Sequence, residues 1–177
     1  MIYFTADTHF GEERKIFSSR RPFDTTDEMD QTMIHNWNKI VSKDDIIFHL
    51  GDFGNYEMVE KLNGRIYLIL GNNERKDIDS NKITLDKLKE LFYNVIEDDI
   101  IYRNFNNLNI AMMHKPENYD KSCFNLFGHI HGRQMIKPFG IDVGVDCHHF
   151  RPISIDDILF YKDAMENYYG KNIYMQE

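Results

Sequence analysis

Five short apolar runs, each followed at once by Asp, Asn or His, constrain the fold of this chain more than any other feature. The clearest run is residues 46–50, which ends at Gly51-Asp52. Branched and aromatic residues over this length predict a buried strand, and the glycine allows a sharp turn at its end. A single aspartate after a strand is typical of a turn or a helix cap, whereas repetition indicates a site. The arrangement occurs four more times, at residues 2–6 before Asp7, 66–70 before Gly71-Asn72, 110–113 before His114 and 124–127 before Gly128-His129.

The order of these runs predicts an α/β fold. A short helix is expected at residues 56–62, between the strands at 46–50 and 66–70. A strand–helix–strand unit of this kind favours parallel neighbours in one sheet. In open α/β sheets, ligands collect outside the carboxyl ends of the strands. We therefore expect the polar side chains to converge, although they are spread over most of the chain.

Three further helices are predicted from capping residues and apolar spacing. Thr25 and Glu28 form a capping-box pattern before an apolar stripe, which predicts a helix over 26–41. Thr84 is expected to cap a helix that reaches Phe92, and Ser154 is expected to start another. The remaining segments are expected to be a polar, arginine-bearing loop at the rim of the site (7–23) and short strands broken by a turn at 104–107 (95–113).

Composition excludes several broad classes. With 177 residues and 42% hydrophobic residues, the chain can build one sizeable core, so we expect a single domain over 1–177. The net charge of −8 argues against a broad nucleic-acid-binding face. No stretch is long and apolar enough to span a membrane or to act as a signal core, so a cytoplasmic protein is expected. The pattern predicts no oligomeric state. The two cysteines, Cys123 and Cys147, fit neither a metal spacing nor a disulfide framework.

The polar residues after the strands have the chemistry of a metal site. Asp, His and Asn offer oxygen and nitrogen donors that suit borderline divalent ions, and no cysteine competes for a softer ion. Two ligands one residue apart, as in Asp7-x-His9 and His129-x-His131, point to the same side of an extended chain. Each pair alone is more often a coincidence than a metal site. The remaining histidines lack such a placement and are interpreted as structural or surface residues: His35, His148 and His149.

Taken together, the ordered motifs resemble the calcineurin-like metallophosphoesterase superfamily. They are Asp-x-His, Gly-Asp, Gly-Asn-x-Glu, an isolated His and Gly-His-x-His-Gly, each after a strand-like run. The likeness extends from Met1 to about Ile158, and within the superfamily it is greatest to a branch of small bacterial and phage phosphoesterases. The pattern of that branch is echoed at residues 7–11, 21–23, 36–38, 49–53 and 143–146.

The resemblance implies a four-layer αββα sandwich of two mixed β-sheets flanked by helices, with a dinuclear metal site at the strand ends. The site would hold two divalent ions, Mn²⁺ in the first place and otherwise Fe, Zn, Ni or Mg. Matched residue by residue, the first ion would be held by Asp7, His9 and His131, the second by Asn72, His114 and His129, and Asp52 would bridge them. A shared carboxylate agrees with the short metal–metal spacing of two-metal phosphatases. The residues implied in catalysis are Asp52, Asn72, Asn73 and His129.

The implied activity is that of a metal-dependent phosphodiesterase or phosphatase. A metal-bridging hydroxide would attack a small phosphorylated substrate, such as a nucleotide. Candidate side chains for contacting the phosphate are Arg14, Arg75 and Arg133. The alternative is a catalytically weakened protein of the same fold that acts as a binding or scaffold module, as the retromer subunit of this fold does. Retention of all seven ligand positions favours the enzyme, because so many unpaired polar groups would be costly to keep together without metal.

The chain departs from the superfamily pattern at two positions. The motif is usually Gly-Asn-His, whereas here Asn73 follows Asn72. The usual histidine stabilises the transition state or protonates the leaving oxygen, and an asparagine cannot deliver a proton. The second departure is Glu12, where the branch often carries histidine. His49 lies within a predicted strand and is expected to pack or to support a ligand rather than to replace the missing acid.

Overall fold

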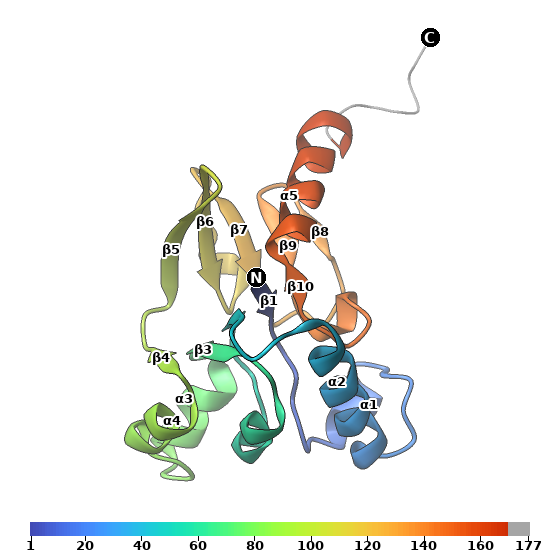
Figure 1. The fold of residues 1–177 in the computed structure, drawn as a ribbon, viewed down its shortest axis with the longest axis vertical. Coiled ribbons are helices and arrows are strands. Elements are labelled where there is room, and N and C mark those ends of the chain that lie inside the picture. The colour runs from blue at the N-terminus through green and yellow to red at the C-terminus, as the bar shows by residue number, and fades with distance from the viewer. Residues whose placement is uncertain (170–177) are drawn as a thin grey trace.

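The structure, a computed structural model, describes residues 1–169 and contains two five-stranded sheets (Figure 1). In the first sheet β1 to β4 run parallel, and the edge strand β10 is antiparallel to β1. Thr5 pairs with His49, and His49 with Leu68, so the carboxyl ends of β1, β2 and β3 lie at the same edge. The order is β10 (Ile153–Ser154), β1 (Ile2–Thr5), β2 (Ile46–His49), β3 (Arg65–Ile69) and β4 (Asn94–Ile96).

The second sheet is also mixed. Its three inner strands are parallel, and its two edge strands are antiparallel to their neighbours. The predicted turn lies between the first two strands, at Asn106 and Asn107, which both have positive φ. Asparagine tolerates this conformation in tight hairpin turns. The order is β5 (Ile100–Phe105), β6 (Leu108–Met113), β7 (Phe124–Phe127), β9 (Gly140–Asp142) and β8 (Ile136–Lys137).

The helices predicted from caps are confirmed. They are α2 (Thr26–Ile40), α4 (Leu85–Leu91) and α5 (Ile155–Ala164), and the predicted short helix is the 3-10 helix η1 (Tyr56–Lys61). Each cap side chain, of Thr25, Thr84 and Ser154, accepts a hydrogen bond from the backbone N–H three residues later. The shorter turns are η2 (Pro116–Asn118), η3 (Val145–Cys147) and the π-helical η4 (Met165–Tyr169).

Two helices were not predicted. The first, α1 (Arg14–Ser18), interrupts the segment expected to be a loop, and the second, α3 (Asn72–Asp79), begins at a predicted ligand. The only fully buried side chain of α3 is the charged Glu74, so the segment has no apolar stripe at helical spacing. The helix is specified by its contacts with the site rather than by its own pattern.

The core has two main layers of apolar side chains. One lies between the sheets, where Phe4 and Leu50 belong to the same cluster as Ile110 and Leu126. The other lies between the first sheet and the helices and includes Trp37. In Figure 1 the helices α1 to α4 lie on the side of the first sheet away from the second. The predicted fold of two mixed sheets flanked by helices is therefore confirmed. Within residues 1–169, no helix combines the length and apolar character needed to cross a bilayer.

Candidate metal centre

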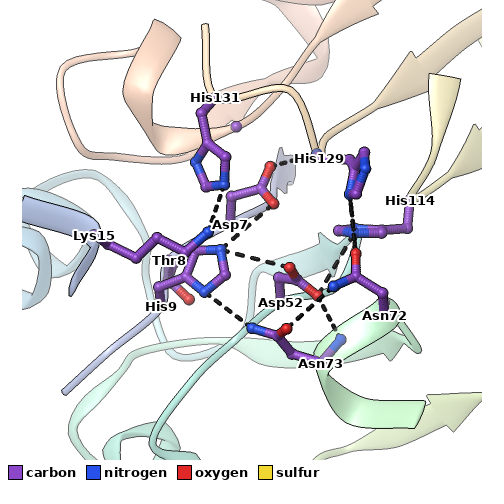
Figure 2. Close-up of polar contacts among 12 residues, drawn as sticks. Asp7, Thr8, His9, Lys15, Asp52, Asn72, Asn73, His114, His129 and His131 are labelled. Atoms are coloured by element: carbon purple, nitrogen blue, oxygen red, sulfur yellow. Dashed lines mark hydrogen bonds and ion pairs between the residues drawn. The ribbon is translucent and has the colours of Figure 1, made fainter. Parts of the chain in front are cut away.

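The candidate site lies where the carboxyl ends of strands from both sheets meet (Figure 2). Residues after β1, β2 and β3 approach residues after β6 and β7. Possible ligand atoms all lie within 4.8 Å of one another in two overlapping sets, Asp7, His9 and His131, and Asp7, Asp52 and His114. We call Asp7, His9 and His131 the first ligand group, and Asn72, His114 and His129 the second ligand group. The structure brings all seven residues implied as ligands into this one place: Asp7, His9, Asp52, Asn72, His114, His129 and His131.

The first group contains buried donor atoms with no protein partner. Asp7 Oδ1 and His9 Nε2 are buried and make no hydrogen bond within the described residues, although they lie 3.9 Å apart. His9 Nδ1 lies 3.0 Å from Glu12 Oε1, so it is the protonated nitrogen and Nε2 presents a lone pair. A buried carboxylate oxygen and a buried lone pair without partners fit a cation bound between them.

The second ligand group contains two lone pairs that face each other. His114 Nδ1 donates to the Leu50 carbonyl at 2.8 Å, which leaves Nε2 without a proton in the neutral ring. That Nε2 lies 2.8 Å from Asn72 Oδ1, which is also only an acceptor. His129 Nδ1 lies 2.9 Å from the same oxygen and 3.2 Å from His114 Nε2. Two acceptors without a proton between them, His114 Nε2 and Asn72 Oδ1, fit a metal ion bound between them, and His129 Nδ1 is placed to join them as a ligand when its ring carries the proton on Nε2.

Asp52 lies between the two groups and faces both. Its Oδ2 is 3.5 Å from His9 Nε2, and its Oδ1 is 3.5 Å from His114 Nε2. The side chain is almost fully buried, and Oδ1 also accepts a hydrogen bond from the Asn73 backbone N–H at 2.9 Å. One carboxylate with an oxygen toward each group has the geometry of a bridging ligand.

The electrostatics of the cluster favour a bound cation. Burial lowers the pKa of His9 to about 4 and also lowers the pKa of His114 and of His129. These rings are therefore neutral, as ligands must be. Burial raises the pKa of Asp7, and the charges of Asp142 and Asp52 raise it further. A nearby cation would offset this cost by favouring the charged carboxylate.

The backbone at the site is strained. Among non-glycine residues, a positive φ is uncommon and costs on the order of 1–3 kcal/mol where the surroundings impose it. Five of the seven residues implied as ligands have φ between 49° and 72°: Asp7, His9, Asp52, His129 and His131. The fold holds these residues in left-handed conformations that turn their side chains into the cluster. Such strain concentrates at functional sites.

The glycines before the ligands are required by close approach. A Cβ at Gly71 would lie 2.6 Å from Asp52 Oδ1, and a Cβ at Gly128 would lie 2.6 Å from Asp7 Oδ2. No side chain fits at either position without displacing a carboxylate of the site. This explains why Asn72 and His129 each follow a glycine in the sequence motifs.

An ion pair between Arg21 and Asp146 supports the first ligand group. Both residues belong to motifs shared with the superfamily branch, but nothing in the sequence pairs them. The Arg21 side chain is fully buried, and its Nε lies 2.8 Å from Asp146 Oδ1. Its terminal nitrogens donate to the carbonyls of Asp7 and Thr8. Asp146 also accepts from His131 Nδ1 at 2.9 Å, which leaves His131 Nε2 to face the site. The hydrogen bonds from Arg21 and His131 hold the pKa of Asp146 down to about 2 against the raising effect of burial.

Glu74 supports the second group from beneath. It is fully buried, and its carboxylate accepts from the backbone N–H groups of Asp52, Phe53 and Gly71 at 2.7–2.9 Å. Burial and the charge of Asp52 raise its pKa to about 7, against the effect of the N–H donors. Glu74 is the acidic residue of the Gly-Asn-x-Glu motif, so the motif contained a signal for this role.

The remaining predicted residues lie around the ligands. Asn73 accepts from the Asn72 amide at 3.1 Å and lies at the rim of the site. His49 is fully buried, with Nε2 3.0 Å from Thr8 Oγ1, in agreement with a packing role. Two of the arginines proposed to contact phosphate pair with acids instead, Arg14 with Glu12 and Arg75 with Asp99, and Arg133 is exposed.

Two cavities open beside the ligands. The larger, of about 630 Å³, is lined by Asn72 and His114 together with the cationic side chains of Arg75, Lys76 and Lys115. The other, of about 460 Å³, is lined by Glu12, Asn73 and again Lys76. The site is therefore open to a small molecule on both sides of the start of α3.

The chain is similar in sequence to known proteins. No protein-family model matches the chain. The uncharacterized protein MJ1445 of Methanocaldococcus jannaschii is 31% identical over 176 residues, with 89% of each chain covered. The Gene 66 protein of Mycobacterium phage L5 is 32% identical over 81 residues, which are 41% of this chain and 39% of that protein.

Among solved structures, the protein of unknown function AQ665 from Aquifex aeolicus superposes with a TM-score of 0.69 at 24% identity, covering 91% of this chain and 98% of that chain. A looser match is to YfcE, a phosphoesterase from E. coli, with a TM-score of 0.40 at 15% identity over 81% of this chain and 77% of that one. The chain belongs to the family of MJ1445 and shares its fold with AQ665.

Proposed function

We propose that this chain is a phosphohydrolase that uses two divalent ions, Mn²⁺ in the first place, to hydrolyse a phosphodiester or phosphomonoester of a small molecule such as a nucleotide. The observation that supports this best is the 2.8 Å approach of His114 Nε2 to Asn72 Oδ1, with no proton available between them. A shared cation is the simplest partner of two such lone pairs. The first ion would be held by Asp7, His9 and His131. The second would be held by Asn72, His114 and His129, and Asp52 would bind both ions.

The bound ions would supply Lewis acidity, which polarises a phosphoryl group and acidifies water. The chain contributes position and charge. Arg75, Lys76 and Lys115 line the larger cavity next to the second ligand group and favour an anionic substrate. Asn73 can donate a hydrogen bond to the substrate but cannot protonate a leaving group, so esters with good leaving groups are the best substrates.

The test is hydrolysis of bis-p-nitrophenyl phosphate and p-nitrophenyl phosphate by metal-stripped protein. Mn²⁺, Ni²⁺, Zn²⁺ or Mg²⁺ is added in turn, and bound metal is counted. We expect metal-dependent turnover with two ions bound per chain. His129→Ala should abolish turnover, whereas the control His35→Ala, at an exposed histidine on α2, should not change it.

The outcomes separate the enzyme from the scaffold alternative. Two bound ions with no turnover on either ester or on nucleotides would favour a binding module that has kept its metals. Absence of both metal and turnover would overturn the proposed function. The preferred ester decides between a diesterase and a monoesterase.

A further inference from the structure

A lysine side chain reaches into the first ligand group. Lys15 belongs to α1, and its Nζ lies 2.8 Å from His131 Nε2. Figure 2 shows this side chain entering the cluster between the rings of His131 and His9. Because His131 Nδ1 is bonded to Asp146, Nε2 is the nitrogen that faces the site. The ammonium therefore uses the lone pair that an ion held by Asp7, His9 and His131 would need.

The charges around Lys15 fit a cation at this place. Burial lowers its pKa, whereas the carboxylates of Asp7, Asp52 and Glu12 act in the opposite direction and favour the ammonium. Without a cation nearby, the negative charges of these carboxylates would repel one another. One of their oxygens, the buried Asp7 Oδ1, has no hydrogen-bond partner among residues 1–169. An ammonium near them neutralises part of this charge.

The second ligand group has no such cation. In the described residues, the hydrogen bonds of Asn72, His114 and His129 involve one another, neighbouring backbone groups, Asp7 and Asn73, and no lysine or arginine. Lys115 and Arg75 line the adjacent cavity without such a contact. The two ligand groups thus differ in one respect: a lysine ammonium contacts a ligand nitrogen in the first group, and no cationic side chain does so in the described part of the second.

We propose that Lys15 is a built-in counter-cation of the first ligand group, so that the two metal positions fill in sequence. An ion binds first at Asn72, His114 and His129, with Asp52. An ion at Asp7, His9 and His131 binds only after it displaces the Lys15 ammonium from His131. This inference depends on the proposed metal centre and adds an order of loading and the residue that sets it.

The test is calorimetric titration of the metal-stripped full chain with Mn²⁺. The wild type should show two steps, the weaker abolished by His131→Asn and the tighter by His129→Asn. Lys15→Met keeps the length of the side chain and removes its charge, and it should tighten the weaker step by at least about tenfold while leaving the tighter step within about twofold. The matched control is Lys43→Met, at an exposed lysine between α2 and β2 whose side chain makes no hydrogen bond or ion pair in the described residues, and it should leave both steps unchanged.

Lys15→Arg retains the positive charge and should keep the weaker step weak, which tests the inference even if Lys15→Met does not fold. An unchanged weaker step in Lys15→Met, or a weaker step abolished by His129→Asn rather than His131→Asn, would overturn the order of loading and leave the proposed enzyme intact. A wild-type chain that binds no Mn²⁺, Ni²⁺ or Zn²⁺ would overturn both proposals.

Discussion

The carboxamide of Asn73 donates a hydrogen bond to the carboxylate of Glu12, with Nδ2 3.2 Å from Oε1. These are the two positions at which the chain departs from the superfamily pattern, and both contact the same ligand. Glu12 Oε1 lies 3.0 Å from His9 Nδ1, and Asn73 Nδ2 lies 3.3 Å from the same His9 nitrogen. The two departures are therefore one local change, in which the Asn73 amide holds the Glu12 carboxylate and that carboxylate accepts from His9 Nδ1.

This pairing sharpens what a histidine at position 73 would do. The Glu12 carboxylate is placed to accept from the introduced imidazole and to favour its protonated form. Asn73→His should therefore raise turnover on an alkyl phosphodiester, up to about 10²-fold, and have much less effect on a p-nitrophenyl ester, which needs no proton donor. Steady-state rates on both esters test this, and equal gains on the two would argue against a missing acid.

Asp52→Asn should disable both metal positions at once. The substitution removes the charge that faces His9 through one oxygen and His114 through the other. We expect weaker binding of both ions and a loss of turnover of more than about 10²-fold. Metal content and turnover are measured after stripping and reloading. Wild-type turnover in the reloaded variant would refute the bridging role.

Asp146→Asn should weaken both the fold and the first metal position. It leaves the fully buried Arg21 guanidinium without its partner charge, which typically costs about 3–5 kcal/mol in the free energy of unfolding. The single amide oxygen of Asn cannot accept from both Arg21 Nε and His131 Nδ1, so the His131 ring is held less well and affinity for one ion should fall about 10–100-fold. Denaturant unfolding and metal titration measure the two effects.

Asp44→Asn is the matched control for this change. Asp44 also pairs with an arginine, Arg65, but its side chain is 93% exposed. Exposed pairs contribute about 1 kcal/mol or less, so the unfolding free energy should barely change. A similar loss in both variants would show that the buried position of Arg21 is not the cause.

His49 should make the metal-free protein sensitive to acid. Burial, with smaller contributions from the charges of His114 and His9, lowers the pKa of His49 to about 3, whereas an unfolded histidine titrates near about 6.5. Below about pH 6.5 the unfolded chain binds a proton that the folded chain does not. The contribution of the neutral His49 to the free energy of unfolding is therefore fully present above about pH 6.5. It is lost as the pH falls toward about 3, by up to about 1.4 kcal/mol per pH unit.

His49→Gln removes this titration and retains a donor for Thr8 Oγ1. Urea unfolding in chelator at pH 7 and pH 5 should show a smaller drop in stability for this variant than for the wild type. The control is His35→Gln, at an exposed position on α2. Its free energy of unfolding should fall between pH 7 and pH 5 by as much as that of the wild type. If the His49→Gln variant keeps the full drop, other buried groups account for it.

The sequence by itself determined the strands that precede the candidate ligands, the capped helices and the identity of those ligands. These features are local, because each strand is an apolar run, each cap is a polar residue at a fixed offset, and each ligand follows its strand directly. The glycines of the motifs have a steric role, because Gly71 and Gly128 leave room for the carboxylates of Asp52 and Asp7.

Only the tertiary structure decided how these side chains are held. Helix α3 has no apolar stripe and forms because Glu74 is buried against the backbone of the Asp52 turn. The contacts of Arg21 with Asp146 and of Lys15 with His131 join residues 125 and 116 positions apart. The distances between such residues are set by the packing of two sheets, which no local pattern records. For the same reason, the free lone pairs and the left-handed backbone of the ligands became visible only in the folded chain.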